Sequence, residues 1–140
     1  MRRSNDVTGY SGTPLAQKLG IKAGCTIYLA GAPPRYPETV APLPPDVQLA
    51  RRLTAAVDIA HVFATKKAAL EKALAVFRRT LKPTAIVWVS WPKLSSRVPT
   101  EVTENTVREM ALPLGFVDVK VCAIDATWSG LKLVVRKELR

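Results

Sequence analysis

The proline-rich stretch from Gly31 to Asp46 limits the fold of this chain more than any other feature. It holds six prolines, at positions 33, 34, 37, 42, 44 and 45, and it directly follows the apolar run CTIYLA at residues 25–30. Such a run is typical of a strand buried on both faces of a parallel sheet. Because proline lacks an N–H group and clashes with the preceding helical turn, we expect no long helix before the next short strand, VQLA at residues 47–50.

Downstream of this stretch, apolar runs alternate with helical patterns. We predict strands at residues 56–64 (AVDIAHVFA) and 84–91 (TAIVWVSW), because both runs are short and apolar. Thr65 is expected to cap the helix between them, and a second helix is expected at residues 103–114. Each helix carries one apolar stripe: Leu70, Leu74, Phe77 and Leu81 on the first, and Val107, Met110, Ala111 and Leu114 on the second.

The two ends of the chain complete the predicted fold. Residues 116–125 and 131–137 read as two strands joined by a turn, the one antiparallel hairpin that we expect. Near the N-terminus we predict a short helix with Thr13 as N-cap and Gly20 as its left-handed stop, behind a flexible arm of residues 1–12. Strands that alternate with helices predict a single α/β domain over residues 1–140, with three layers, a mostly parallel Rossmann-like sheet and a degenerate, proline-rich first crossover.

Composition favours a basic globular protein with acidic partners. Hydrophobic residues make up 48% of the chain and charged residues 23%, and the net charge is +10. No apolar run approaches the roughly 20 residues of a membrane helix, and no apolar segment follows the N-terminal arginines as in a secretory signal, so we expect a cytoplasmic protein. The basic residues are spread along the chain and aromatic residues are only 6%, so a dedicated nucleic-acid surface is not evident.

Over nearly its whole length the chain resembles an uncharacterised bacterial family, domain-of-unknown-function family 3052. The segments TGYSGTPLAQKLGIKAG, APPRY, VSWPK and VPTEVTENTVREMALPLGFVDVKVCAIDATWSGLKL carry this resemblance. The C-terminal half, from LKPTAIVWVSW onward, also resembles class I S-adenosylmethionine-dependent methyltransferases, which end in a parallel strand and a closing antiparallel hairpin. The first resemblance implies no established activity, and the second implies a methyltransferase-like fold.

The loop after the first strand lacks what a nucleotide site needs. Gly31 stands alone, Pro33 and Pro34 have no N–H to donate, and no long helix follows to direct its N-terminus at a phosphate. The spaced glycines of methyltransferases are missing, as is an acidic residue after the second strand that could hold a ribose. We therefore expect no resident cofactor.

Ligands of open α/β sheets bind beyond the carboxyl ends of the parallel strands. The predicted order brings basic, aromatic and polar residues there, with Thr65, Lys66 and Lys67 beside them. Arg35 could grip a carboxylate or phosphate in a fork, Lys93 could act as a point charge, and the tryptophans could form an apolar wall. The candidate ligand-binding residues are Arg35, Tyr36, Ser90, Trp91, Lys93, Asp125 and Trp128. The tryptophans could instead cap the core, and Asp125 could instead organise a turn.

Residues suited to catalysis or metal binding are few. His61 is the single histidine and lies on a predicted buried strand, so we expect a hydrogen-bonded structural role. Cys25 and Cys122 fall in strand-like segments without metal or redox spacing, so we expect two reduced, buried thiols and no metal site. Ser90 and Lys93 match the Ser-x-x-Lys spacing, but they follow a strand and enclose Pro92, which favours a chance match.

These patterns leave three hypotheses open. The first is a non-catalytic domain that binds a small anion or an acidic protein partner through a basic carboxyl edge. The second is a degenerate S-adenosylmethionine-dependent, methyltransferase-like enzyme, and the third is a non-specific nucleic-acid binder. The lack of a cofactor loop favours the first, and with it a protein that is not an enzyme.

Overall fold

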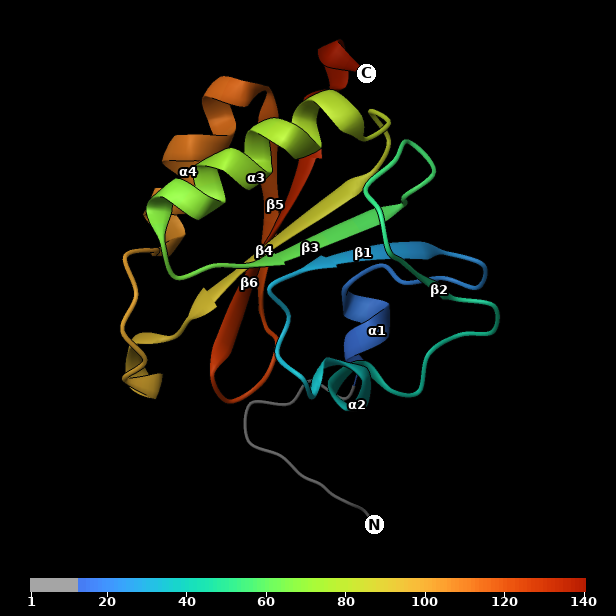
Figure 1. The fold of residues 1–140 in the computed structure, drawn as a ribbon, viewed down its shortest axis with the longest axis horizontal. Helices are drawn as coiled ribbons and strands as arrows, with labels where there is room; N and C mark the ends of the chain where they lie inside the picture. The colour runs from blue at the N-terminus through green and yellow to red at the C-terminus, as the bar shows by residue number, and fades with distance from the viewer. Residues whose placement is uncertain (1–12) are drawn as a thin grey trace.

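The fold is built on one six-stranded sheet (Figure 1). The structure, a computed structural model, describes residues 13–140, so the predicted N-terminal arm lies outside the described residues. The strand order is β2-β1-β3-β4-β6-β5, in which the first four are mutually parallel and β6 runs antiparallel to both of its neighbours. The strands are β1 (Thr26–Ala30), β2 (Gln48–Ala50), β3 (Ile59–Phe63), β4 (Ile86–Pro92), β5 (Phe116–Ala123) and β6 (Trp128–Val135).

Helices cover both faces of this sheet, which confirms the three-layer α/β prediction. The longer helices α3 and α4 lie on one face, and the short helices α1 and α2 lie on the other (Figure 1). Within the described residues, short 3₁₀ turns follow longer elements at Leu94–Ser96, Leu112–Leu114 and Lys137–Leu139. The helices are α1 (Leu15–Lys18), α2 (Tyr36–Val40), α3 (Lys67–Thr80) and α4 (Glu104–Ala111). None of these helices is long and apolar enough to cross a membrane, as far as residues 13–140 show.

The alternation of side chains along the central strands divides the core in two. On β3, Ala60 and Val62 face the α3 side, while Ile59, His61 and Phe63 face the α1 and α2 side. Every residue of β3 is buried, as the apolar run predicts for a central parallel strand. The predicted helix stripes are confirmed as well, because one stripe of each helix packs into the core beside β3 and β4: Leu70, Leu74 and Phe77 of α3 and Val107 and Ala111 of α4.

Two predicted helix starts are wrong by one residue each. Thr65 does not cap α3, because the helix begins at Lys67 and its first N–H donates to Glu101 Oε1 at 2.9 Å. The acceptor comes from a loop 34 residues further along the chain, which no local capping rule can reveal. Near the N-terminus, Pro14 rather than Thr13 is the N-cap of α1, whereas Gly20 does adopt the expected left-handed conformation at φ +84°.

The proline-rich segment and the hairpin each differ in one detail from the prediction. Residues 31–46 contain no long helix, as expected, but they form the single-turn helix α2, which tolerates Pro37 because proline disturbs nothing in a first turn. The hairpin turn is shorter than predicted. Trp128 and Ser129 already belong to β6, where they pair with Pro92 and Trp91 of β4. The hairpin thus places β6 between β4 and β5.

Candidate functional site at the carboxyl edge of the sheet

The carboxyl edge has a topological switch point between β1 and β3. The chain passes from β1 to its neighbour β2 on one side, and from β3 to β4 on the other, which is where ligands of open α/β sheets bind. Gly31 ends β1 at this point with φ +71°. A Cβ atom there would lie 2.7 Å from the carbonyl oxygen of Phe63, so only glycine allows the loop to approach β3 this closely.

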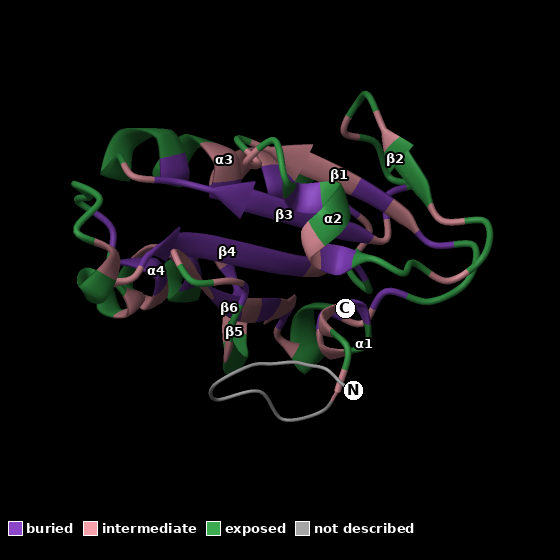
Figure 2. Ribbon diagram, turned by 90° about the horizontal axis from the view of Figure 1, so that it is seen from below, coloured by how far each residue is buried: buried purple, intermediate pink, exposed green. Residues whose placement is uncertain are grey.

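Aromatic side chains close this switch point. Tyr36, the first residue of α2, is only 3% exposed, and its ring packs edge-on against His61 and Phe63 with centroids 5.7 and 5.9 Å apart. Phe63 in turn meets the ring of Trp128 edge-on at 5.2 Å. Burial raises the pKa of the Tyr36 hydroxyl, which therefore stays protonated. We call these four residues, Tyr36, His61, Phe63 and Trp128, the aromatic floor; Figure 2 shows α2 lying across the buried strands β3 and β4.

His61 of this floor forms a buried polar pair with Ser90 of β4. Both residues are fully buried, and His61 Nε2 lies 2.7 Å from Ser90 Oγ. Burial lowers the pKa of His61 to about 3, so the imidazole is neutral at physiological pH. His61 Nδ1 has no partner among the residues that the structure describes. The hydrogen-bonded, structural role expected for His61 is confirmed. Ser90 lies on β4 and its hydroxyl contacts His61, so the Ser-x-x-Lys spacing of Ser90 and Lys93 does not fall on a helix.

Of the remaining candidate residues, two have structural roles and two lie at the surface. Trp91 is 7% exposed and packs on the α3 face, away from the aromatic floor. Asp125 Oδ1 accepts hydrogen bonds from the N–H groups of Thr127 and Trp128, both at 2.8 Å, so it organises the hairpin turn. Arg35 is exposed beside Glu38, with 3.7 Å between Nε and Oε2, and Lys93 is partly exposed at the end of β4. Among residues 13–140, the structure thus places Tyr36, Ser90 and Trp128 on one face of the sheet and Trp91 on the other.

A basic rim surrounds the closed switch point. We define it as Arg35, Lys66, Lys67, Lys93 and Arg97, which follow the carboxyl ends of β1, β3 and β4. The carboxylates of this edge are already engaged: Glu38 by Arg35, Glu101 by the Lys67 N–H, and Asp125 by its own turn. Leu94 lies between Lys93 and Arg97 and is 97% exposed. The edge therefore presents positive charge and one protruding apolar side chain.

The residues at this edge do not fit an adenosyl cofactor. The Tyr36 ring is packed against His61 and Phe63 at the end of β3, and Pro33 and Pro34 cannot donate N–H groups to a ligand. After β2, where a ribose would need a carboxylate, the chain has Arg51 and Arg52. Helix α2, with five residues, is too short to direct a useful dipole at a ligand. No step of methyl transfer can be derived from this arrangement.

The fold is nevertheless that of methyltransferases. The chain is similar to an S-adenosylmethionine-dependent methyltransferase from Aquifex aeolicus, with 15% identity, a TM-score of 0.65, and 87% of this chain and 88% of that chain covered. It is also similar to a 16S rRNA (adenine(1408)-N(1))-methyltransferase from Catenulisporales acidiphilia, with 15% identity, a TM-score of 0.53, and 86% and 88% covered. A third similar structure is a ribosomal protein L11 methylase from Lactobacillus delbrueckii subsp. bulgaricus, with 11% identity, a TM-score of 0.54, and 86% and 74% covered.

At these identities the likeness shows the fold alone. It confirms the methyltransferase-like, mostly parallel sheet with its antiparallel hairpin. No family model and no curated protein matches the chain. Membership in domain-of-unknown-function family 3052 therefore stays a prediction.

Residues 13–140 give no evidence for a metal site or for a nucleophilic cysteine. No group of His, Cys, Asp or Glu side chains in this part of the chain could hold a metal ion. Cys25 and Cys122 are free thiols, and burial raises the pKa of both. Cys25 is buried as predicted, whereas Cys122 on β5 is only partly buried. Neither thiol is activated as a nucleophile, because a raised pKa keeps it protonated.

Sequence reasoning missed a charged pair at the opposite, amino edge of the sheet. Lys82 Nζ lies 2.5 Å from Asp58 Oδ1, and Asp58 Oδ2 accepts the Thr26 N–H at 2.8 Å. The pair ties the starts of β1 and β3 to the segment before β4. A signal was present, since Asp58 and Lys82 are charged residues that precede two mainly apolar strands, β3 and β4, but nothing in the sequence shows that they meet.

Proposed function

We propose that the protein is a non-catalytic interaction domain, in which the basic rim and Leu94 bind an acidic protein partner. The observation that carries this proposal is the contrast within the carboxyl edge, where Tyr36, His61 and Phe63 are buried, whereas Leu94 and four cations are exposed: Arg35, Lys66, Lys67 and Arg97. Within residues 13–140, Lys66, Lys67, Lys93 and Arg97 make no ion pair. Exposed cations around an apolar side chain suit a partner with carboxylates around an apolar contact.

An acidic model peptide tests the charge component directly. Fluorescence anisotropy would measure binding of labelled poly-glutamate at low salt to the protein and to the double variant Arg35→Ala/Lys93→Ala. The matched control is Lys72→Ala/Arg79→Ala, which removes the same charge from exposed positions on α3. Two surface cations account for roughly a fivefold loss of affinity, and this loss is expected in the rim variant only. Equal losses in both variants would mean that net charge alone drives binding.

A degenerate S-adenosylmethionine-dependent enzyme is the second candidate, and the structural comparisons favour it over the first. The chain shares its fold with methyltransferases along most of its length, and Gly31 brings the loop after β1 close to β3. Calorimetry with millimolar S-adenosylmethionine separates the two candidates. Absence of binding heat would reject the hypothesis of an S-adenosylmethionine-dependent enzyme. Stoichiometric binding that is lost in Gly31→Val would favour this enzyme over the interaction domain.

A further inference from the structure

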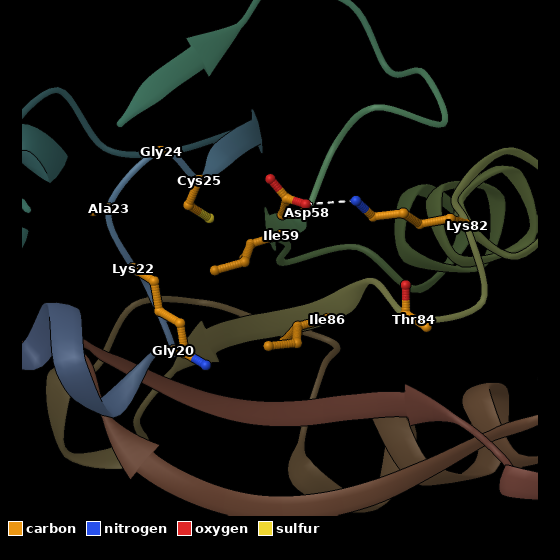
Figure 3. Close-up of a pocket in the computed structure, with 10 residues that line it drawn as sticks. All are labelled: Gly20, Lys22, Ala23, Gly24, Cys25, Asp58, Ile59, Lys82, Thr84 and Ile86. Carbon is orange, nitrogen blue, oxygen red and sulfur yellow. Dashed lines mark hydrogen bonds and ion pairs between the residues drawn. The ribbon is translucent and has the colours of Figure 1, made fainter. Parts of the chain in front are cut away.

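The amino edge of the sheet has an open pocket, on the side opposite to the aromatic floor. Its volume is about 430 Å³, which falls in the range of small-molecule sites. The loop that follows α1 forms one wall, and the starts of β3 and β4 form the other (Figure 3). Three segments that are far apart in the sequence thus enclose one cavity.

Apolar side chains line the base of this pocket. Ile59 and Ile86 begin β3 and β4 on the α1 side of the sheet, and Figure 3 shows them next to each other beneath the Cys25 thiol. The facing loop contains Gly20 and Gly24, which have positive φ angles of +84° and +78°. A Cβ on Gly20 would lie 3.2 Å from Ile86 Cδ1, so glycine at this position leaves the isoleucine side chain uncrowded. The pocket can therefore accept an apolar group against the two isoleucines.

Polar groups stand on both sides of this apolar base. Lys82 uses one donor on Asp58 Oδ1 and keeps two more, because an ammonium group has three. Both oxygens of Asp58 already accept a hydrogen bond, from Lys82 and from the Thr26 N–H. The Thr84 hydroxyl has no hydrogen-bond partner in residues 13–140 and lies beside this pair (Figure 3). The free hydrogen-bonding capacity of this side consists mainly of donors.

The electrostatic balance of the pocket is positive. Lys22 lines the opposite wall and is exposed, so the lining holds two ammonium groups against the single carboxylate of Asp58. Lys132 and Lys120 stand nearby, directly opposite each other on β6 and β5. Burial lowers the pKa of Lys132, and the charges of Lys120 and Lys22 lower it further. Cations brought this close repel one another unless an anion lies between or beside them.

We propose that this pocket binds a small organic anion, a carboxylate or a phosphate ester with an apolar body. The anionic group contacts Lys82 and the Thr84 hydroxyl, the apolar body packs on Ile59 and Ile86, and Lys22 attracts the anion from the opposite wall. This site is separate from the basic rim and does not depend on it, because the two lie at opposite ends of the parallel strands. The protein would then bind its small-molecule ligand at the edge that methyltransferase-like folds do not use for this purpose.

Four probes test the proposed chemistry by calorimetry at low salt. Phenyl phosphate and benzoate combine an anion with an apolar ring and represent the two ligand sources, benzamide has the ring without the charge, and inorganic phosphate has the charge without the ring. We expect one of the ring anions to bind and to exceed both benzamide and inorganic phosphate by roughly tenfold. Failure of both ring anions to bind, or equal binding of benzamide, would overturn the proposal.

Charge-matched variants locate the binding. Lys22→Gln should weaken the better ring anion roughly threefold, through the lost attraction of one exposed charge, and its exposed position leaves the core intact. Lys72→Gln on α3 removes the same charge at a distance and should change nothing, and Arg35→Ala/Lys93→Ala should retain binding. Equal losses for Lys22→Gln and Lys72→Gln would contradict a site at the amino edge, without bearing on the basic rim.

The two cysteines give an independent readout without mutation. Cys25 lines the pocket and Cys122 lies on β5 outside its lining. Bound ring anion should slow alkylation of Cys25 by iodoacetamide, followed by mass spectrometry of the two peptides, and leave the rate at Cys122 unchanged. Slowing of both thiols, or of neither at a saturating probe concentration, would count against occupation of the pocket.

Discussion

The two edges of the sheet differ in how far side chains fill the space beside the strand ends. At the carboxyl edge, beside the topological switch point, Tyr36, Phe63 and Trp128 pack against one another, and the buried side chains of His61 and Ser90 bond to each other. At the amino edge, charged side chains surround an open cavity. The comparison teaches that topology marks where a ligand can bind, while side-chain volume decides whether it does.

The comparison also predicts where stability resides. Tyr36, His61, Phe63 and Ser90 at the carboxyl edge are buried, so their loss leaves cavities or unpaired polar atoms. Asp58 and Lys82 at the amino edge are each more than one third exposed, so water and salt screen their interaction. Substitutions of the buried group should therefore cost far more than substitutions of the Asp58–Lys82 pair.

The largest effect is expected for Tyr36→Ala. Truncation of a buried aromatic side chain costs about 3 to 5 kcal/mol through lost burial and the cavity that remains. Urea denaturation would measure this loss in the free energy of unfolding. Tyr36→Phe keeps the ring contacts with His61 and Phe63 and should cost much less. If Tyr36→Ala costs less than about 1 kcal/mol, the aromatic floor is not packed as described.

Acid should destabilise the protein through His61. The unfolded histidine takes up a proton near its ordinary pKa of 6.5, whereas the folded one resists until about pH 3. The unfolded state therefore binds more protons between these values, and stability falls with pH by about 1.4 kcal/mol per unit, or roughly 3 kcal/mol from pH 6.5 to pH 4. Urea midpoints across this range would show the slope, which His61→Gln should flatten. An equal slope in His61→Gln would mean that another group causes the pH dependence of stability.

Ser90→Ala should have an intermediate effect. It leaves His61 Nε2 without a partner, in addition to Nδ1, inside a fully buried site. An unsatisfied buried polar group costs about 1 to 3 kcal/mol, and chemical denaturation of Ser90→Ala would detect it. The double variant Ser90→Ala/His61→Phe removes both polar groups and should recover part of the loss. A double variant no more stable than the single one would argue against the pairing as the cause.

The smallest effect is expected for Asp58→Asn at the amino edge. The hydrogen bonds from Lys82 and from the Thr26 N–H lower the pKa of Asp58. Its charge therefore stabilises the fold above the ordinary carboxyl pKa, and this contribution is lost as pH falls through the folded value. Because the pair is partly exposed, we expect about 1 kcal/mol or less at pH 7. A loss as large as that of Tyr36→Ala would contradict the contrast between the edges.

The sequence predicts the layers of this fold better than its edges. The stripe of α3 and the fully buried β3 follow from local periodicity, which depends on neighbouring residues alone. The segment APPRYP is typical of an exposed loop, which predicts that Tyr36 is available to a ligand. Instead, the short helix α2 directs the Tyr36 ring into the core. The cap on α3 from Glu101 and the pocket between Lys22, Asp58 and Thr84 depend on segments that meet only in space.

The claim that the carboxyl edge is closed while the amino edge is open can be tested in one titration. Backbone amide NMR spectra of the ¹⁵N-labelled protein would be followed as S-adenosylmethionine, and then phenyl phosphate, is added to millimolar concentration. We predict no shifts at Gly31 and Phe63 with the first compound, and shifts at Lys22, Gly24 and Thr84 with the second. Saturable shifts at Gly31 and Phe63 with S-adenosylmethionine would contradict this account.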